Sequence, residues 1–105
     1  MAGNREADWT EAATAVAGVA TATRAAESGN RHSIAGIIAS FSAVTIALVQ
    51  IKFGTVVEWE GYVHNSLAVQ FSSPLRAGSG QAVSAVLAAG AAGVTGTVTI
   101  TGYSA

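Results

Sequence analysis

The stretch TVVEWEGYVHNSLAVQFSSP, residues 55–74, decides the fold because its apolar and polar residues alternate with a period of two. Alternation of this kind is typical of a β-strand with one face buried. The segment Thr55–Val63 places its apolar residues Val57, Trp59 and Val63 on one face, and Glu58, Glu60, Tyr62 and His64 on the other. Leu67, Val69 and Phe71 repeat the pattern after a compact polar turn at 64–66, and Pro74 ends it because proline cannot continue a ladder. The stretch therefore predicts two consecutive strands.

The same period extends outward in both directions. Further strands are expected at Ser33–Phe41, Val44–Phe53, Ala82–Ala89 and Val94–Tyr103. The third of these segments also fits a short helix, because alanine is a good helix former. Six short strands at even spacing predict an all-β fold, namely a small antiparallel β-sandwich or jelly-roll-like barrel with an extended N-terminal arm.

Residues 1–31 differ from the rest and are expected to form that arm, with the β-sandwich domain at 32–105. They hold seven of the eleven charged side chains, together with an Ala/Thr/Val stretch interrupted by Gly18. Valine, threonine and glycine are weak helix formers, so we expect the arm to be extended or partly helical. A turn at residues 27–30 closes it, since Gly29 and Asn30 tolerate a positive φ.

Residues 33–51, SIAGIIASFSAVTIALVQI, are an uncharged run long enough to span a bilayer as a helix. The run contains several serines and threonines, and its apolar residues are largely β-branched. A turn at residues 41–43 divides it into two pieces of strand length. The sequence thus favours two strands, with a single-span membrane protein as the alternative.

The charge content indicates how the surface is used. Half of the residues are apolar and only 10% are charged, whereas about a quarter of the residues are charged in an average soluble domain. We therefore expect other subunits to cover much of the surface. The net charge of −1 makes nucleic acid and anionic membranes unexpected partners. Without cysteine, disulfides and thiolate metal sites are excluded.

Residues suited to catalysis are sparse, and we expect no enzyme, cofactor or metal site. Glu58 and Glu60 make the best acid–base pair, because an i,i+2 spacing places both carboxylates on one face of a strand. No catalytic motif accompanies them, so two charges on a solvent-facing or subunit-facing surface explain them better. The loop Gly78-Ser79-Gly80 lacks the lysine of a phosphate-binding loop and is interpreted as a turn.

Several side chains are instead suited to protein contacts. Trp9 lies among charged residues, and it either anchors the arm in a neighbouring subunit or folds back on its own domain. Three of the arginines, Arg24, Arg31 and Arg76, can form forked hydrogen bonds to Glu58, Glu60 or Glu27 across a subunit boundary. A glycan-binding module needs an exposed aromatic side chain, for which Tyr62 and Tyr103 are the candidates. The expected interface residues are Trp9, Arg24, Arg31, Glu58, Glu60, Tyr62 and Arg76.

Residues 31–103 resemble a group of small virion proteins of tailed bacteriophages and prophages. The resemblance rests on RHSIAGIIASFS (31–42), IKFGTVVEWEGYV (51–63), FSSPLRAGSG (71–80) and AVSAVLAAGAAGVTGTVTITGY (82–103). These are patterns rather than catalytic motifs, and Ala77 stands where the group has glycine after the arginine of the turn. The resemblance implies a component of the virion, such as a capsid decoration (cement) protein or a head–tail accessory protein.

These observations predict a non-enzymatic virion protein, with a capsid decoration protein that stabilises the particle as the leading expectation. Its partners would be further copies of itself, with a trimer as the first expectation, and other virion proteins such as the major capsid protein. Deleting residues 1–26 is expected to abolish assembly while leaving the β domain folded. The alternatives are a β-sandwich module that binds a glycan or a host surface, and the single-span membrane protein.

Overall fold

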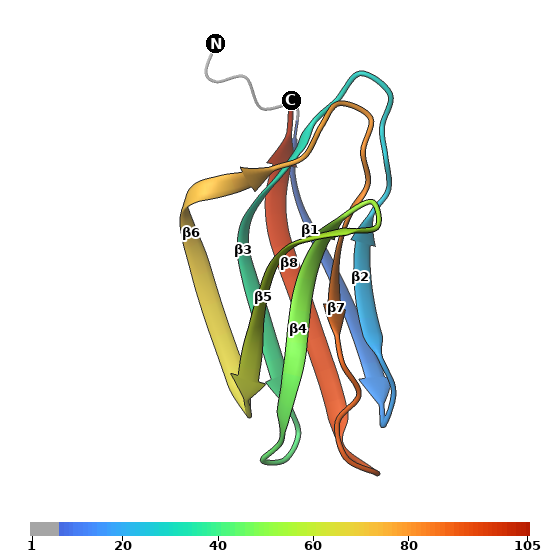
Figure 1. The fold of residues 1–105 in the computed structure, drawn as a ribbon, viewed down its shortest axis with the longest axis vertical. Coiled ribbons are helices and arrows are strands. Elements are labelled where there is room, and N and C mark those ends of the chain that lie inside the picture. Colours follow the sequence, from blue (N-terminus) through green and yellow to red (C-terminus); the bar gives the residue numbers. More distant parts are fainter. Residues whose placement is uncertain (1–6) are drawn as a thin grey trace.

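The computed structural model describes residues 7–105, with side chains described from Trp9 onward, and contains only β-strands as regular secondary structure. The eight strands run up and down the long axis of the molecule, except that the end of β6 bends across it (Figure 1). They are β1 (Ala7–Val16), β2 (Ala20–Arg24), β3 (His32–Phe41), β4 (Ile46–Phe53), β5 (Val56–His64), β6 (Ser66–Arg76), β7 (Val83–Leu87) and β8 (Thr95–Ser104).

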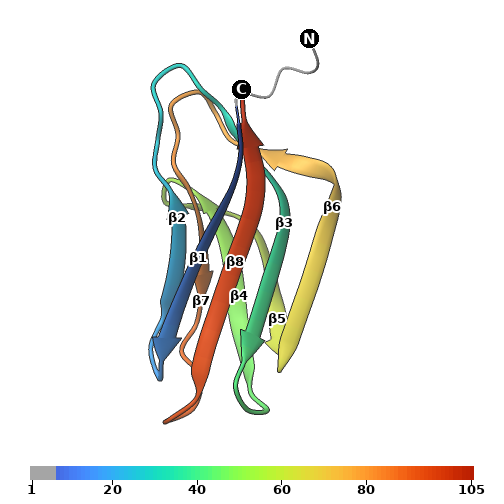
Figure 2. The ribbon, with the colours of Figure 1, turned by 180° about the vertical axis from the view of Figure 1, so that it is seen from behind.

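The strands pair so that the first half of the chain folds back along the second half. β1 pairs with β8, β2 with β7, β3 with β6 and β4 with β5, all antiparallel. Further pairing of β3 with β8 and of β4 with β7 gives two four-stranded sheets, β1-β8-β3-β6 and β5-β4-β7-β2. The two sheets connect through a single residue pair, His64↔Ser66. Figures 1 and 2 show them as two facing layers, which is the jelly-roll arrangement.

The core lies between the two layers and follows the alternation seen in the sequence. In β4, Val49, Ile51 and Phe53 are buried, and the residues between them are partly exposed. In β8 the inward set includes Val98 and Ile100, whereas the outward set consists of threonines and Tyr103. Burial of these branched side chains removes apolar area from water, which contributes about 25 cal/mol per Å² to stability. The β-sandwich prediction is confirmed.

The N-terminal segment requires a correction. From Ala7 onward it is not an arm, because β1 pairs with β8 over ten residues and β2 pairs with β7 over five. The inward side chains Trp9, Ala20 and Ala22 belong to the hydrophobic core. The boundary expected at residue 31 therefore does not separate two units within the described residues, and residues 1–6 of the expected arm lie outside them. The turn at residues 27–30 is present, with Gly29 at φ 81°.

The backbone decides between strand and helix at two places. Residues 33–51 form most of β3 and β4, so a transmembrane helix over this run is wrong. None of the described residues belongs to a helix of the length and apolar character that crossing a membrane requires. The segment Ala82–Ala89 contains the strand β7, and a short helix there is wrong as well.

Candidate functional site

A chain of buried hydrogen bonds at one end of the sandwich explains where Trp9 lies. The indole Nε1 of Trp9 donates to the Ser104 hydroxyl at 3.0 Å, and that hydroxyl lies 2.6 Å from Nδ1 of His32. The other ring nitrogen of His32 is 2.8 Å from the carbonyl oxygen of Ala25. Because a carbonyl only accepts, Nε2 donates there, and in the neutral ring Nδ1 accepts from Ser104. This network joins β1, β3 and β8.

Trp9 is therefore a core residue, and the predicted role as an interface anchor is wrong. Its side chain is 7% exposed and meets the His32 ring edge-on, with 5.9 Å between the ring centroids. The second possibility for this residue, that it folds back on its own domain, is confirmed. Ser104 and His32 are also buried, so this serine–histidine pair has no access to a substrate and serves to hold three strands together.

Arg24 also finds its partners within its own chain. Its guanidinium lies over the Trp9 ring, 5.6 Å from the centroid, and pairs with Glu11 at 3.1 Å and with Glu27 at 3.2 Å. The pKa of Glu27 is lowered, first by a hydrogen bond from the Asn30 amide and also by the charge of Arg24. Both carboxylate partners of Arg24 are therefore intramolecular, and a contact of Arg24 to another subunit stays a prediction.

The other two arginines predicted to lie at an interface, Arg31 and Arg76, are at the surface. Arg31 donates from Nε to the carbonyl oxygen of Ala77 at 2.9 Å, and Arg76 is exposed at the end of β6. Within residues 9–105, the ion pairs are those of Arg24, so neither surface arginine pairs with Glu58 or Glu60 in the same chain. Contacts of Arg31 and Arg76 to another subunit stay a prediction.

The predicted residues of β5 are accessible. Tyr62 is 64% exposed, and Glu60 accepts a hydrogen bond of 3.0 Å from Gln50 on the neighbouring strand β4. Glu58 lies at a register shift and has no partner opposite it on β4. The sequence pattern placed these side chains on the outer face correctly, but Val57 is 41% exposed rather than buried, because the same shift changes the alternation.

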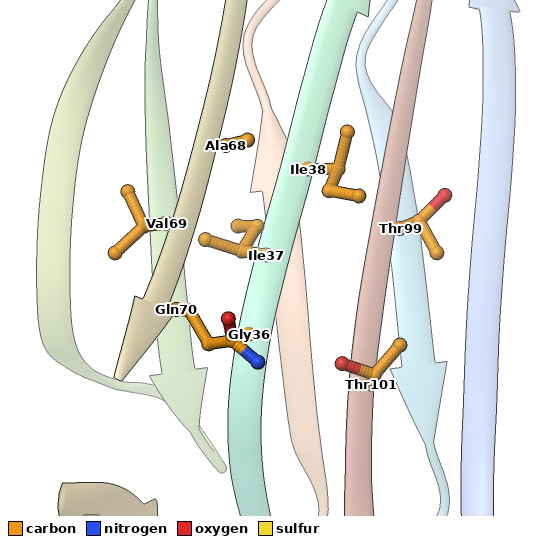
Figure 3. Close-up of a pocket in the computed structure, with 8 residues that line it drawn as sticks. All are labelled: Gly36, Ile37, Ile38, Ala68, Val69, Gln70, Thr99 and Thr101. Atoms are coloured by element: carbon orange, nitrogen blue, oxygen red, sulfur yellow. The ribbon is translucent and has the colours of Figure 1, made fainter. Parts of the chain in front are cut away.

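A groove on the outer face of the other sheet was not foreseen from the sequence. It has a volume of about 320 Å³ and lies across the three neighbouring strands β6, β3 and β8 (Figure 3). Its lining residues are Gly36, Ile37, Ile38, Ala68, Val69, Gln70, Thr99 and Thr101. Ile37 belongs to the core and Val69 packs against it, so these two residues line the groove from its base.

The remaining six lining residues form a grid of two rows across three strands. In one row Gly36 lies between Gln70 and Thr101. The second row, Ala68, Ile38 and Thr99, follows at the next outward positions, about 7 Å further along the strands. The two smallest side chains, at Gly36 and Ala68, stand diagonally in this grid. The hollow exists because neighbouring positions on the sheet carry almost no side-chain volume.

Gly36 is essential to this shape. A Cβ atom added there would lie 3.2 Å from the Val69 carbonyl oxygen and 3.4 Å from the Thr101 hydroxyl oxygen. The pairing of β3 with both neighbours also shifts register between Ile34 and Gly36. A bulge and a glycine at the same place lower the sheet surface locally, which is a known device for making a binding surface.

The groove is chemically neutral. The hydroxyls of Thr99 and Thr101 and the carboxamide of Gln70 supply both donors and acceptors. Ile38, which is 56% exposed, and Ala68 supply aliphatic surface. None of the described residues that line the groove is charged. Among the side chains described, no group of three or more acidic, histidine or cysteine residues is placed to hold a metal ion.

The two tyrosines proposed for glycan contact lie on different sheets. Tyr103 stands on β8 two residues after Thr101, on the outer face that carries the groove. Tyr62 stands on β5 in the opposite sheet. A single platform formed by both tyrosines is therefore excluded, and only Tyr103 is near the groove.

Comparisons with known proteins give structural neighbours only. No family model and no curated protein sequence matches the chain. The CBM36-1 domain of a xylanase from the hindgut metagenome of Trinervitermes trinervoides is 15% identical, with a TM-score of 0.45, and the match covers 85% of this chain and 74% of that one. A carbohydrate-binding module CBM36 in complex with calcium and xylotriose is 14% identical, with a TM-score of 0.48, and the match covers 88% of this chain and 77% of that one. The insecticidal delta-endotoxin Cry8Ea1 of Bacillus thuringiensis is 11% identical, with a TM-score of 0.48, and the match covers 93% of this chain and 19% of that one.

Proposed function

We propose that this chain is a non-catalytic binding module whose groove on the β8-β3-β6 face takes a short segment of an uncharged glycan. The observation that carries the proposal is the lining of the groove. Hydroxyl and carboxamide groups stand beside aliphatic side chains there, and the described lining contains no charge.

A neutral sugar matches both the polar and the aliphatic parts of this lining. Its hydroxyls both donate and accept hydrogen bonds, as do Thr99, Thr101 and Gln70. The C–H surface of its ring is apolar and fits against Ile38 and Ala68. A phosphate, a sulfate or a uronic acid would bring a charge into a site that offers no counter-charge, and losing its hydration there would be unfavourable.

The size of the groove limits the ligand to a short segment. Its volume of about 320 Å³ is near the lower end of ligand pockets, which begin at about 300 Å³. The groove lies on a sheet face rather than in a closed cavity, so a longer chain can continue beyond it. Tyr103, two residues beyond Thr101, is placed to contact such a continuation.

Filling the groove tests the proposal. Ala68 is exposed, so Ala68→Trp blocks the hollow without entering the core. The matched control is Ala89→Trp, at an exposed position after β7 and outside the lining. Gel affinity electrophoresis against neutral and acidic polysaccharides should show retardation by a neutral one, lost in Ala68→Trp and kept in the control.

A finer variant measures the hydrogen bonding. Thr99→Val replaces a hydroxyl by a methyl group of the same shape, which removes a hydrogen bond worth about 0.5–1.5 kcal/mol. The dissociation constant should rise by about 2- to 10-fold in titration calorimetry. If no neutral glycan binds, or if binding is the same in Ala68→Trp, the groove is not a glycan site.

A second candidate function is the virion subunit that the sequence resemblance implies. One observation favours it, namely the exposed apolar side chains around the β4–β5 hairpin, including Ile46, Val56 and Tyr62. A decoration protein buries such surface against its neighbours. Mass spectrometry of phage particles from cells that encode this chain should then detect it in many copies per particle. Its absence from the particles would exclude this function.

A further inference from the structure

Four connections between strands meet at one end of the sandwich. They follow β1, β3, β5 and β7, and they lie at the lower end of the molecule in Figures 1 and 2. We call them the loop tip, which comprises residues 17–19, 42–45, 65 and 88–94. Three backbone hydrogen bonds of 2.9 Å hold the tip together, from the amides of Ala17, Ser42 and Asn65 to the carbonyl oxygens of Val94, Thr95 and Thr45 respectively.

Large apolar side chains are exposed at the loop tip. Val44 is 89% exposed, and Val19 is 58% exposed. Val16 and Ile46, at the strand ends beside them, are exposed as well, so this end carries four of the eight exposed large hydrophobic side chains of the described residues. The fold itself leaves this apolar surface uncovered, and a concentration of this kind indicates an interaction site.

The chain that forms this end of the molecule is also uncharged. The stretches that meet at the loop tip, residues 12–23, 32–51, 61–75 and 77–105, contain no aspartate, glutamate, lysine or arginine. The eleven charged residues all lie outside these stretches. Moving a charged side chain out of water is costly, whereas this end of the molecule can leave water without that cost.

Size and composition argue against a protein as the partner of the loop tip. The molecule measures 23 Å by 18 Å across its long axis, so two copies placed end to end would bury about 800 Å² in total, less than the roughly 1,200 Å² at which stable specific interfaces begin. The tip also contains no tryptophan, tyrosine, methionine or arginine, which are the side chains enriched in protein interfaces. A lipid surface needs neither a large flat area nor such anchors.

We propose that the loop tip enters the surface of a zwitterionic lipid bilayer, such as one of phosphatidylcholine. Val19 and Val44 then reach the boundary between headgroups and acyl chains, where apolar side chains are favourable. The hydrogen bonds within the tip suit this environment, because they already pair backbone groups that would lose water there. The proposal does not depend on glycan binding, since the groove lies on a sheet face and not at this end.

Flotation with phosphatidylcholine vesicles tests the proposal. The unmodified chain should float with the vesicles. Val19→Ser with Val44→Ser should lower the partition coefficient about tenfold or more, because two apolar side chains no longer enter the bilayer. The matched control is Val56→Ser with Val57→Ser, the same change at two exposed valines at the opposite end of the sandwich, and it should float as the unmodified chain does. All three proteins should give the same β-type circular dichroism spectrum.

Two further measurements separate a lipid surface from other partners. Adding phosphatidylserine or raising the salt concentration should leave binding unchanged, because the tip carries no charge. The chain has no cysteine, so Val44→Cys and Val57→Cys can each carry a polarity-sensitive fluorophore, and vesicles should shift the emission to the blue only for the label at residue 44. The proposal is overturned by an absence of flotation, by equal flotation of the two double variants, by a requirement for phosphatidylserine, or by self-association that the tip variant abolishes.

Discussion

Replacing Trp9 by alanine is expected to lower the free energy of unfolding by about 3–5 kcal/mol. The indole is 7% exposed, so nearly all of its roughly 150–250 Å² is removed from water. At about 25 cal/mol per Å² this burial is worth about 4–6 kcal/mol, of which the alanine methyl group retains a part. The substitution also removes the donor to Ser104 and the ring beneath Arg24. Small domains are stable by only about 5–15 kcal/mol in total.

Two further variants separate this core role from an interface role. Trp9→Phe keeps an aromatic ring but loses the Nε1 donor, and should cost about 1–2 kcal/mol. Thr10→Ala changes an exposed neighbour on the same strand and should stay within about 0.5 kcal/mol of the original protein. Urea unfolding followed by circular dichroism gives all three values. If Trp9→Ala costs less than about 1 kcal/mol while it changes the oligomeric state, the core assignment is refuted.

Two more predictions concern the N-terminal strands and the turn that follows them. Deletion of residues 1–26 removes β1 and β2 and should abolish the cooperative unfolding transition. A folded 27–105 fragment would contradict the pairing described. The pKa of Glu27 is lowered in the folded state by Asn30 and Arg24, so its contribution to stability is present above about pH 4.5 and is lost as the pH falls through the folded pKa. Urea midpoints measured from about pH 6 to pH 3 should fall more steeply in the original protein than in Glu27→Gln, and equal slopes would count against this.

The sequence predicts most of the sandwich because its large apolar residues alternate. The six strands from β3 to β8 were expected close to their observed positions, and the polar turn at Asn65 lies where β5 gives way to β6. The expectation that Pro74 ends its strand is wrong, because β6 continues through Pro74 and pairs with β3 at Leu75 and Arg76. β1 and β2 were missed because their inward positions hold mainly alanine, as at Ala20 and Ala22. A methyl group is too small to produce a clear period, so the pattern resembled a flexible arm. Only the pairing with β7 and β8 shows that these alanines are buried.

The groove could not be predicted for a different reason. It depends on the absence of side-chain volume at Gly36 and Ala68, which lie far apart in the sequence and become neighbours through strand register. The bulge beside Gly36 sets that register, and the alternation of apolar and polar residues around it does not predict a bulge. A glycine inside an otherwise regular strand was the one available signal. By contrast, the exposure of Glu60 and Tyr62 followed from alternation alone.

The pairing of β1 with β8 has a consequence for how the protein is made. Trp9 lies opposite Gly102, so the first described strand finds its partner only when the last one has left the ribosome. At typical synthesis rates of about 5–20 residues per second, β1 waits for roughly 5–20 seconds. During that time the inward faces of β3 and β4 are synthesised without the strands that cover them. The sandwich therefore cannot be completed before β8 has been synthesised, and its yield in cells depends on how well these exposed strands are kept from pairing with those of neighbouring nascent chains.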